Sequence, residues 1–348
     1  MACIPRNAFR AAVALVLSAG LLGATPAFSG GHNTPGRVIE LIEVTDEQLR
    51  VLRNNNPAFS QMDDEELIRL ISILKNEEGM VSDETVNNEV GVLVLAHGFH
   101  GEGYDEFRAA FKPVADVYPT GYGFGLAILE SDHLQTVIDQ ITSQGAKKIV
   151  LFPATTALNS GMVRQWEYAL NFREDFAYTA VERIETDAEM IWAPGPIPHP
   201  LSGEILRDHA RALSEDPANE LVIITGHGPQ RKADNDRELE ILQRHADFMK
   251  ADVGFYDVRP RNVQDDAPPQ VRADNVEVIR GWVVEAKADD KDVIVVTTVL
   301  TAASVMQKLE NDTKDLDVRF SSAGMMTNER FSEWLNFAIQ DTLAQIDN

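Results

Sequence analysis

The chain has 348 residues, a formal net charge of −24 and one cysteine, Cys3. The strong negative charge argues against nucleic-acid binding, which needs a basic face. Because the only cysteine is close to the N-terminus, the rest of the chain can form no disulfide, cysteine-type zinc site or cysteine nucleophile.

The first 29 residues have the pattern of a signal peptide. Arg6 and Arg10 precede an apolar run at 11–22, and small residues follow at 24–29. This run is short for a bilayer span of about 20 residues, so it favours a cleaved signal over a retained anchor. Cleavage would remove two arginines and change the net charge from −24 to −26. We therefore expect an exported protein, periplasmic or extracellular, with no stable membrane insertion after cleavage.

Residues 30–88 are predicted to be a helical N-terminal extension, and an alternation of strands and helices follows it. The extension is acidic and contains two helical patterns. From residue 89, apolar runs typical of buried strands alternate with helices, which predicts parallel sheets with right-handed crossovers. The predicted helices are 46–54, 63–76, 105–117, 132–144, 159–171, 201–213, 234–250, 270–287, 302–311 and 328–345. The predicted strands are 90–96, one following the glycine-rich segment 121–129, and 148–153, 190–193, 220–225, 252–257, 292–298 and 316–320.

The two halves of this alternation share a motif. An apolar run ends in His97-Gly98 in the first half and in His227-Gly228 in the second. The second half is longer by a stretch rich in proline and charge, 258–269. The predicted fold class is therefore α/β, with two similar open parallel-sheet domains at 89–205 and 217–345 and a cleft between them.

Each of these histidines follows the carboxyl end of a predicted strand, where open parallel sheets bind ligands. A neutral imidazole there can bind a divalent metal or act as a base near neutral pH. The alternative is a histidine that only hydrogen-bonds the turn. His100 and Glu102 follow His97 and could share a cation with it, although a solvated loop explains them equally well.

The third predicted strand of the first half ends in Thr155-Thr156, and the second half has Thr297-Thr298 at a similar place. Their hydroxyls could bind carboxylates or water, or could simply satisfy the edge of the sheet. The glycine-rich run 121–125 precedes a strand and does not link a strand to a helix, so no nucleotide loop is expected. There is also no Gly-x-Ser-x-Gly elbow, which argues against a serine hydrolase.

A strand ending in His-Gly, repeated in two α/β halves, resembles the sirohydrochlorin cobaltochelatase family, the class II tetrapyrrole chelatases. The resemblance rests on Val94-Leu95-Ala96-His97-Gly98, on Ile224-Thr225-Gly226-His227-Gly228, on Val163-Arg164-Gln165, and on the segment from Ala193 to Leu206. It covers roughly residues 90–340. It implies two domains enclosing a tetrapyrrole, into which Co²⁺, or Fe²⁺ or Ni²⁺ in relatives, is inserted without a nucleotide.

The resemblance also implies roles for particular residues. His97 and His227 would be catalytic, and with His100 they would bind the metal. Thr155, Thr156, Asn159 and Arg164 would line the tetrapyrrole site. The family usually has a second histidine where this chain has Asn159, which cannot accept a proton. Arg108, Arg231 and Lys232 also lie near the predicted cleft and could offset the negative charge there.

The sequence thus predicts metal insertion into a tetrapyrrole such as sirohydrochlorin, with Co²⁺ as the first candidate and a place in cobalamin biosynthesis. The alternative is an exported metal- or tetrapyrrole-binding protein that has the same fold but no chelatase activity.

Overall fold

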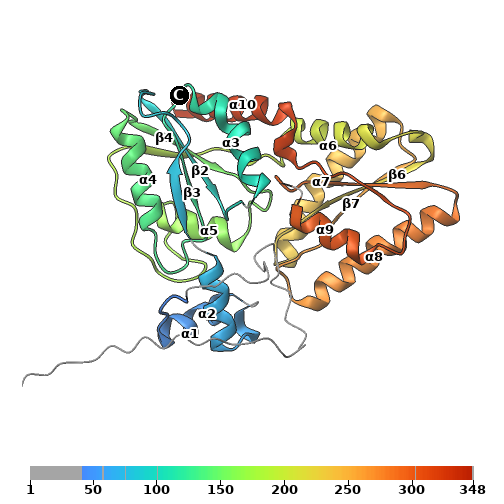
Figure 1. The fold of residues 1–348 in the computed structure, drawn as a ribbon, viewed down its shortest axis with the longest axis horizontal. Helices are drawn as coiled ribbons and strands as arrows, with labels where there is room; N and C mark the ends of the chain where they lie inside the picture. The colour runs from blue at the N-terminus through green and yellow to red at the C-terminus, as the bar shows by residue number, and fades with distance from the viewer. Residues whose placement is uncertain (1–40, 57–58, 75, 100, 302, 347–348) are drawn as a thin grey trace, which may run out of the picture.

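The computed structural model describes residues 41–56, 59–74, 76–99, 101–301 and 303–346 (Figure 1). The predicted signal peptide at 1–29 and His100 lie outside these residues. The chain forms two sheets, one with strand order β1-β3-β2-β4-β5 and the other with order β7-β6-β8-β9. All strand pairs are parallel except β1 with β3, so the predicted α/β fold with two parallel-sheet domains is confirmed.

The elements follow the predicted alternation. The N-terminal part contains α1 (Asp46–Asn55), η1 (Phe59–Gln61), α2 (Asp64–Ile73) and β1 (Glu77–Met80). The first domain contains β2 (Val90–Ala96), α3 (Glu102–Ala115), β3 (Thr120–Phe124), α4 (Asp132–Ser143), β4 (Lys148–Pro153), α5 (Gly161–Ala169) and β5 (Glu189–Trp192). The second part contains α6 (Pro200–Leu213), η2 (Pro217–Asn219), β6 (Glu220–Gly226), α7 (Lys232–Val253), β7 (Asp257–Asn262), α8 (Pro269–Ala288), β8 (Asp292–Thr297), α9 (Ala303–Asp312), β9 (Arg319–Phe320), η3 (Met325–Thr327) and α10 (Glu329–Ile346).

The register of the two sheets aligns the two His-Gly turns but not the two Thr-Thr pairs. Leu95, two residues before His97, pairs with Pro153, whereas Thr225, two residues before His227, pairs with Thr297. Thr297 is therefore equivalent to Pro153, and the threonine pairs are out of phase by two residues. Sequence comparison matched identical residues, whereas backbone hydrogen bonding determines which positions are equivalent.

The glycine-rich run is itself a strand, which corrects the prediction that it precedes one. It forms β3, between β2 and the edge strand β1. A Cβ on Gly121 would lie 2.3 Å from Cγ2 of Val137, and one on Gly123 would lie 2.5 Å from Cδ2 of Leu134. The glycines therefore let α4 pack close to the sheet, and this packing cannot be read from local strand propensity.

The predicted strand at 252–257 is also wrong. Helix α7 continues to Val253 and ends at Gly254, which has the left-handed φ of 83° common after helices. Strand β7 follows at 257–262 and contains Pro260. A proline is tolerated there because β7 is the edge of the second sheet. The stretch that looked like an insertion is therefore in part a strand.

The N-terminal extension packs against the carboxyl side of the first sheet (Figure 1). Its helices share a hydrophobic cluster with Ile128 and Tyr178, and the Nδ2 atom of Asn55 donates to the carbonyl of Tyr178 at 2.9 Å. Beyond the two predicted helices, the extension supplies β1, which pairs antiparallel with β3. This strand is short and half-exposed, so no buried-strand pattern marks it.

Two helices tie the domains together. The C-terminal helix α10 crosses to the first domain and lies along α3 (Figure 1), where the Ser332 hydroxyl donates to the Ala110 carbonyl at 3.2 Å. The Trp334 ring packs on Phe152, with ring centroids 4.8 Å apart. Helix α6 packs on α7 and β8 of the second sheet. One hydrophobic cluster therefore continues through both domains. The domain limits 89–205 and 217–345 stay a prediction.

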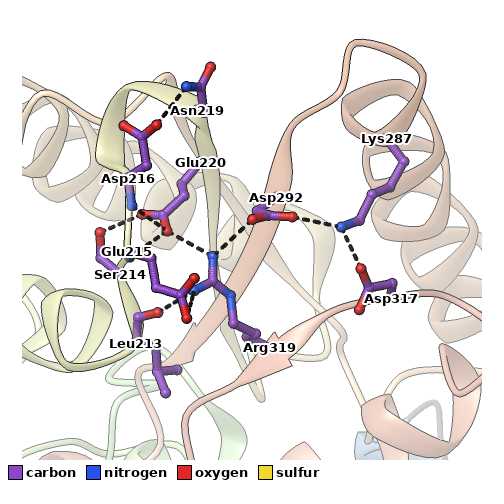
Figure 2. Close-up of polar contacts among 10 residues, drawn as sticks. All are labelled: Leu213, Ser214, Glu215, Asp216, Asn219, Glu220, Lys287, Asp292, Asp317 and Arg319. Atoms are coloured by element: carbon purple, nitrogen blue, oxygen red, sulfur yellow. Dashed lines mark hydrogen bonds and ion pairs between the residues drawn. The ribbon is translucent and has the colours of Figure 1, made fainter.

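A polar network fastens the start of the second sheet (Figure 2). Glu220 is 1% exposed and accepts hydrogen bonds from the backbone N–H groups of Glu215 and Asp216 at 2.8 and 3.2 Å. Arg319 of β9 donates to the same carboxylate at 2.7 Å and also binds the Leu213 carbonyl at 2.6 Å. The network thus joins the end of α6 to β6 and β9. Burial works against the charged carboxylate, but these donors lower the pKa of Glu220.

Candidate functional site

His97 is displayed at the carboxyl end of the central strand β2. It is exposed, and Gly98 follows it with a φ of 118° that an L-residue rarely adopts. Two residues further on, the Phe99 ring stacks on Phe107 and meets Phe124 edge-on, with centroid distances of 5.4 and 5.3 Å. The aromatic contact anchors the loop behind His97, so the imidazole is presented at the surface of the sheet edge.

His227 occupies the equivalent end of β6, but its imidazole has two oxygen partners. Nε2 lies 3.3 Å from Oδ2 of Asp266, and Nδ1 lies 3.2 Å from the carbonyl oxygen of Gly228. A carboxylate and a carbonyl both accept hydrogen bonds, so both nitrogens donate and the ring is an imidazolium. Burial opposes the charge, but the attraction and hydrogen bond of Asp266 outweigh it, and Asp265 and Gly228 add to this, raising the pKa of His227 to about 9.

Asp266 interacts electrostatically with residues of both domains. Burial tends to raise the pKa of its carboxyl, but His227, followed by His97 and Lys308, lowers it below its usual value. His97 belongs to the first domain and the other three residues to the second. The carboxyl ends of the two sheets also touch, because a Cβ on Gly103 would lie 3.1 Å from Cγ2 of Thr301. The two His-Gly turns therefore act on a shared carboxylate.

The loop that carries Asp266 is held in a strained conformation. Gln264 has a φ of 55°, which is uncommon for a residue with a side chain. Its Nε2 donates to the Pro229 carbonyl at 2.6 Å, and its Oε1 accepts from Nδ2 of Asn275 at 3.1 Å. The neighbouring Asp265 is 3% exposed and binds Nε of Arg272 at 2.6 Å. Strain maintained by such contacts is typical of functional loops.

Glu238 is a buried acid in the field of His227. Its side chain is 5% exposed, and Oε1 accepts from Nδ2 of Asn262 at 3.0 Å. Burial raises the pKa of Glu238 to about 7, although Asn262 and His227 oppose the shift. The second domain therefore holds an acid that exchanges protons near neutrality next to an imidazolium.

The first-domain residues predicted to line the site have mostly structural contacts. The Thr155 hydroxyl accepts from the backbone N–H of Ala157 at 3.2 Å, and Thr156 is buried. Asn159 is exposed, and its backbone carbonyl accepts from Nη1 of Arg164 at 2.8 Å. The structure thus brings Asn159 and Arg164 together. The Thr155 hydroxyl is instead bonded within its own turn.

Arg164 also reaches the second domain. Its Nη1 lies 3.5 Å from Oδ2 of Asp234 in the first turn of α7, and the two side chains are only 22% and 11% exposed. Arg164 and Asp266 also both act on the hydroxyl of Tyr178, whose pKa is raised first by burial and then by Asp266. The N-terminal extension, which packs on Tyr178, therefore lies close to the junction of the domains.

A cavity of about 480 Å³ adjoins Asp266 on the side of β7. Its lining comes from the second domain, mainly from the first turns of α7 and α8 and the end of β7. The lining residues are Gln230, Arg231, Lys232, Asn235, Asp236, Leu239, Arg261, Gln264, Asp266, Pro268, Val271, Asp274 and Asn275.

Within the described residues, no group of three or more His, Cys, Asp or Glu side chains is arranged to hold a metal ion. In the same part of the chain, no helix is long and apolar enough to cross a membrane. A metal ion bound among these residues would therefore need further donors, such as water.

No protein-family model matches this chain, and no curated protein matches it. Among solved structures, it is similar to SirB from Bacillus subtilis with Fe³⁺, at a TM-score of 0.56 and 15% sequence identity, over 75% of this chain and 98% of SirB. It is also similar to DR2241 from Deinococcus radiodurans, described as a multi-domain protein with structural similarity to chelatases and two additional novel domains. That match has a TM-score of 0.46 and 14% identity, over 72% of this chain and 55% of DR2241. The likeness to SirB shows a shared fold, which here consists of the parallel-sheet α/β domains that the motifs predicted.

The sequence placed both histidines directly after strand ends, as the structure has them, but it did not indicate Asp266 or Glu238. Asp265-Asp266 lies in the stretch 258–269 that was interpreted as an insertion. The signal would have been the two adjacent acids that begin three residues beyond the end of β7 at Asn262, because the strand ends of a parallel sheet converge on its ligand site. Glu238 gave no signal, since its burial depends on how α7 packs.

Proposed function

We propose that this protein binds a divalent transition metal and inserts it into a tetrapyrrole, with Co²⁺ as the first candidate metal and Fe²⁺ and Ni²⁺ as further ones. One observation carries the proposal. Two equivalent His-Gly turns, at the strand ends of two similar parallel sheets, act on the same carboxylate, Asp266. The fold shared with SirB, a structure containing Fe³⁺, supports it.

In this proposal His97 binds the incoming metal and accepts protons. Insertion replaces two pyrrole N–H protons by metal–nitrogen bonds, so a nearby base and a weak metal ligand both help. His97 is exposed and can serve in either role. His227 has no lone pair to offer while it is an imidazolium, and it becomes a metal ligand only after losing a proton.

In this proposal the second domain contributes an ion pair and a group that exchanges protons. The His227–Asp266 pair is neutral overall, so it adds no net charge near the arriving cation. Glu238, with a pKa of about 7, can take up or release a proton at working pH. We propose that His97 contacts the metal and accepts one of the two protons that the macrocycle loses, and that the ionised Glu238 takes up the other.

The proposed partners are a tetrapyrrole such as sirohydrochlorin and the metal, both as substrates, without nucleotide or nucleic acid. Carboxylates of the macrocycle would be attracted by Arg108, Arg231 and Lys232, because the protein is otherwise acidic. We further propose that the protein is exported and acts outside the cytoplasm.

The second candidate function is binding of the metal or tetrapyrrole without insertion. Two observations favour it. Asn159, which stands where the family that the motifs resemble usually has a histidine, cannot accept a proton, and both nitrogens of His227 are already engaged. Such a protein would bind its ligand but leave the spontaneous insertion rate unchanged.

The test is anaerobic incubation of the protein with sirohydrochlorin and Co²⁺ or Fe²⁺, following the absorption spectrum against the spontaneous rate. We expect the protein to accelerate insertion, His97→Ala to abolish the acceleration, and Asn159→His to increase it. His199→Asn is the matched control, because His199 caps α6 and asparagine can also cap a helix. Binding without acceleration would support the second function. If the protein neither binds these ligands nor accelerates insertion, both candidate functions are refuted.

A further inference from the structure

We propose that the cavity beside β7 is a binding site for a small polyanion, a ligand that carries two or more carboxylate or phosphate groups. Its volume of about 480 Å³ lies within the range of small-molecule sites. Arg231 and Arg261 are the groups that would bind the anion. The inference concerns the second domain alone and does not depend on metal insertion.

The charge balance of the lining carries the argument. Three carboxylates line the cavity, and each is engaged by a neighbour. The pairs are Asp236 with Lys232, Asp266 with His227, and Asp274 with Gln270. By contrast, neither Arg231 nor Arg261 has a side-chain hydrogen bond or ion pair to any residue that the structure describes. The lining therefore has three cationic side chains, Arg231, Lys232 and Arg261, against three carboxylates. In a protein with a net charge of −24, a cavity without net negative charge is positive relative to the rest of the molecule.

Arg261 is the more informative of the two. Its Nε atom is buried, and it has no hydrogen-bond partner among the described residues. A buried donor without a partner costs roughly 1–3 kcal/mol, so such groups usually serve a function. A guanidinium presents parallel N–H donors that match both oxygens of a carboxylate or phosphate.

The N-termini of two helices also favour an anion in this cavity. Helix α7 begins at Lys232 and α8 at Pro269, and neither has a side-chain cap. The two helices have 22 and 20 residues, and their first turns lie in the cavity lining. Uncapped N–H groups at a helix start favour anions. Gln264, held in its strained conformation, also lines the cavity, so the site is built on a fixed loop.

The carboxylate or phosphate groups can come from two kinds of ligand. One is a free small polyanion. The other is the set of peripheral carboxylates on a tetrapyrrole held at the domain junction, because Asp266 belongs both to the cavity lining and to the shared histidine site. Only the second source rests on the proposed function.

The experiment is isothermal titration calorimetry on the metal-free full-length protein with tricarballylate and with inorganic tripolyphosphate. We expect one binding site for at least one of these probes, with an affinity that falls as salt rises. Arg261→Gln and Arg231→Gln should each weaken binding at least tenfold, and Arg261→Lys should weaken it less because it keeps the charge. The matched control is Arg244→Gln on α7, because Arg244 is exposed and, among the described residues, its side chain bonds only the Glu240 carbonyl of its own helix.

Thermal unfolding of each variant confirms that it is folded. Absence of binding by both probes at millimolar concentration overturns the proposal, as does an equal loss in Arg244→Gln. The source is decided with sirohydrochlorin. If sirohydrochlorin competes with tricarballylate, and this competition is lost in Arg261→Gln, the site binds the carboxylates of the macrocycle. If both ligands bind at the same time, the site binds a free polyanion.

The two proposals fail separately. His97→Ala should retain tricarballylate binding, because His97 does not line the cavity. A protein that binds tricarballylate but inserts no metal disproves only the chelatase function. A protein that inserts metal but binds neither probe disproves only the polyanion site.

Discussion

Asp266→Asn should convert His227 from an imidazolium into a neutral imidazole at physiological pH. The carboxylate lies 3.3 Å from Nε2 and is the strongest of the influences that raise the pKa of His227 to about 9. Compared with an ordinary value of about 6.5, the shift corresponds to roughly 3 kcal/mol in favour of the charged ring. The carboxylate side chain is 39% exposed, so solvent screening makes this an upper figure. We expect the substitution to lower the pKa of His227 by on the order of 2 units.

The measurement is an NMR titration of the histidine ring resonances between pH 5 and 10. His199 is the internal reference, because it has no contact with Asp266 and should titrate unchanged. Proton linkage determines how the stability of the folded state changes with pH. The ion pair stabilises the folded state fully below the unfolded pKa of about 6.5, and this contribution is lost as pH rises toward 9. A wild-type His227 that titrates near 6.5, or an unchanged pKa in Asp266→Asn, would refute the reasoning.

Three further predictions concern stability and are checked by urea unfolding. His133 is 5% exposed with neither ring nitrogen bonded to a described residue, and burial lowers its pKa to about 4. Stability should fall by roughly 2 kcal/mol between pH 7 and pH 5, because the unfolded chain takes up the proton first, and His133→Leu should flatten this slope. Gly121→Ala should cost about 1–3 kcal/mol, since its Cβ would lie 2.3 Å from Val137. The control Gly281→Ala, in an exposed helix position with open space around it, should stabilise by about 1 kcal/mol. Glu220→Gln should destabilise by roughly 2–4 kcal/mol, because it leaves a half-buried arginine and two backbone donors without their carboxylate. An unchanged midpoint would show that the network of Figure 2 is not important for stability.

The sequence by itself determined the alternation of strands and helices and the position of both histidines. Buried parallel strands are continuous apolar runs, so β2 and β6 stand out, and the residue after each run must lie at the sheet edge where ligands bind. His97 and His227 were therefore predictable without any knowledge of packing. Where strands lacked this pattern, the prediction failed. Strand β3 is rich in glycine because a helix packs closely on it, and β7 contains charges and a proline because it is an edge.

Only the tertiary structure decided the charge state of the histidine in the second turn. The two turns share the His-Gly pair, yet the pKa of His227 is raised to about 9 because a loop nearly 40 residues further along the chain brings Asp266 to its Nε2. That contact depends on a left-handed Gln264 and on partners in α8, none of which has a local sequence signature. A pKa is determined by charges and burial in space. The grouping of Arg231 and Arg261 at one cavity likewise depends on how the chain folds. Local pattern can place a residue at the end of a strand, but its charge state depends on the neighbours that folding brings to it.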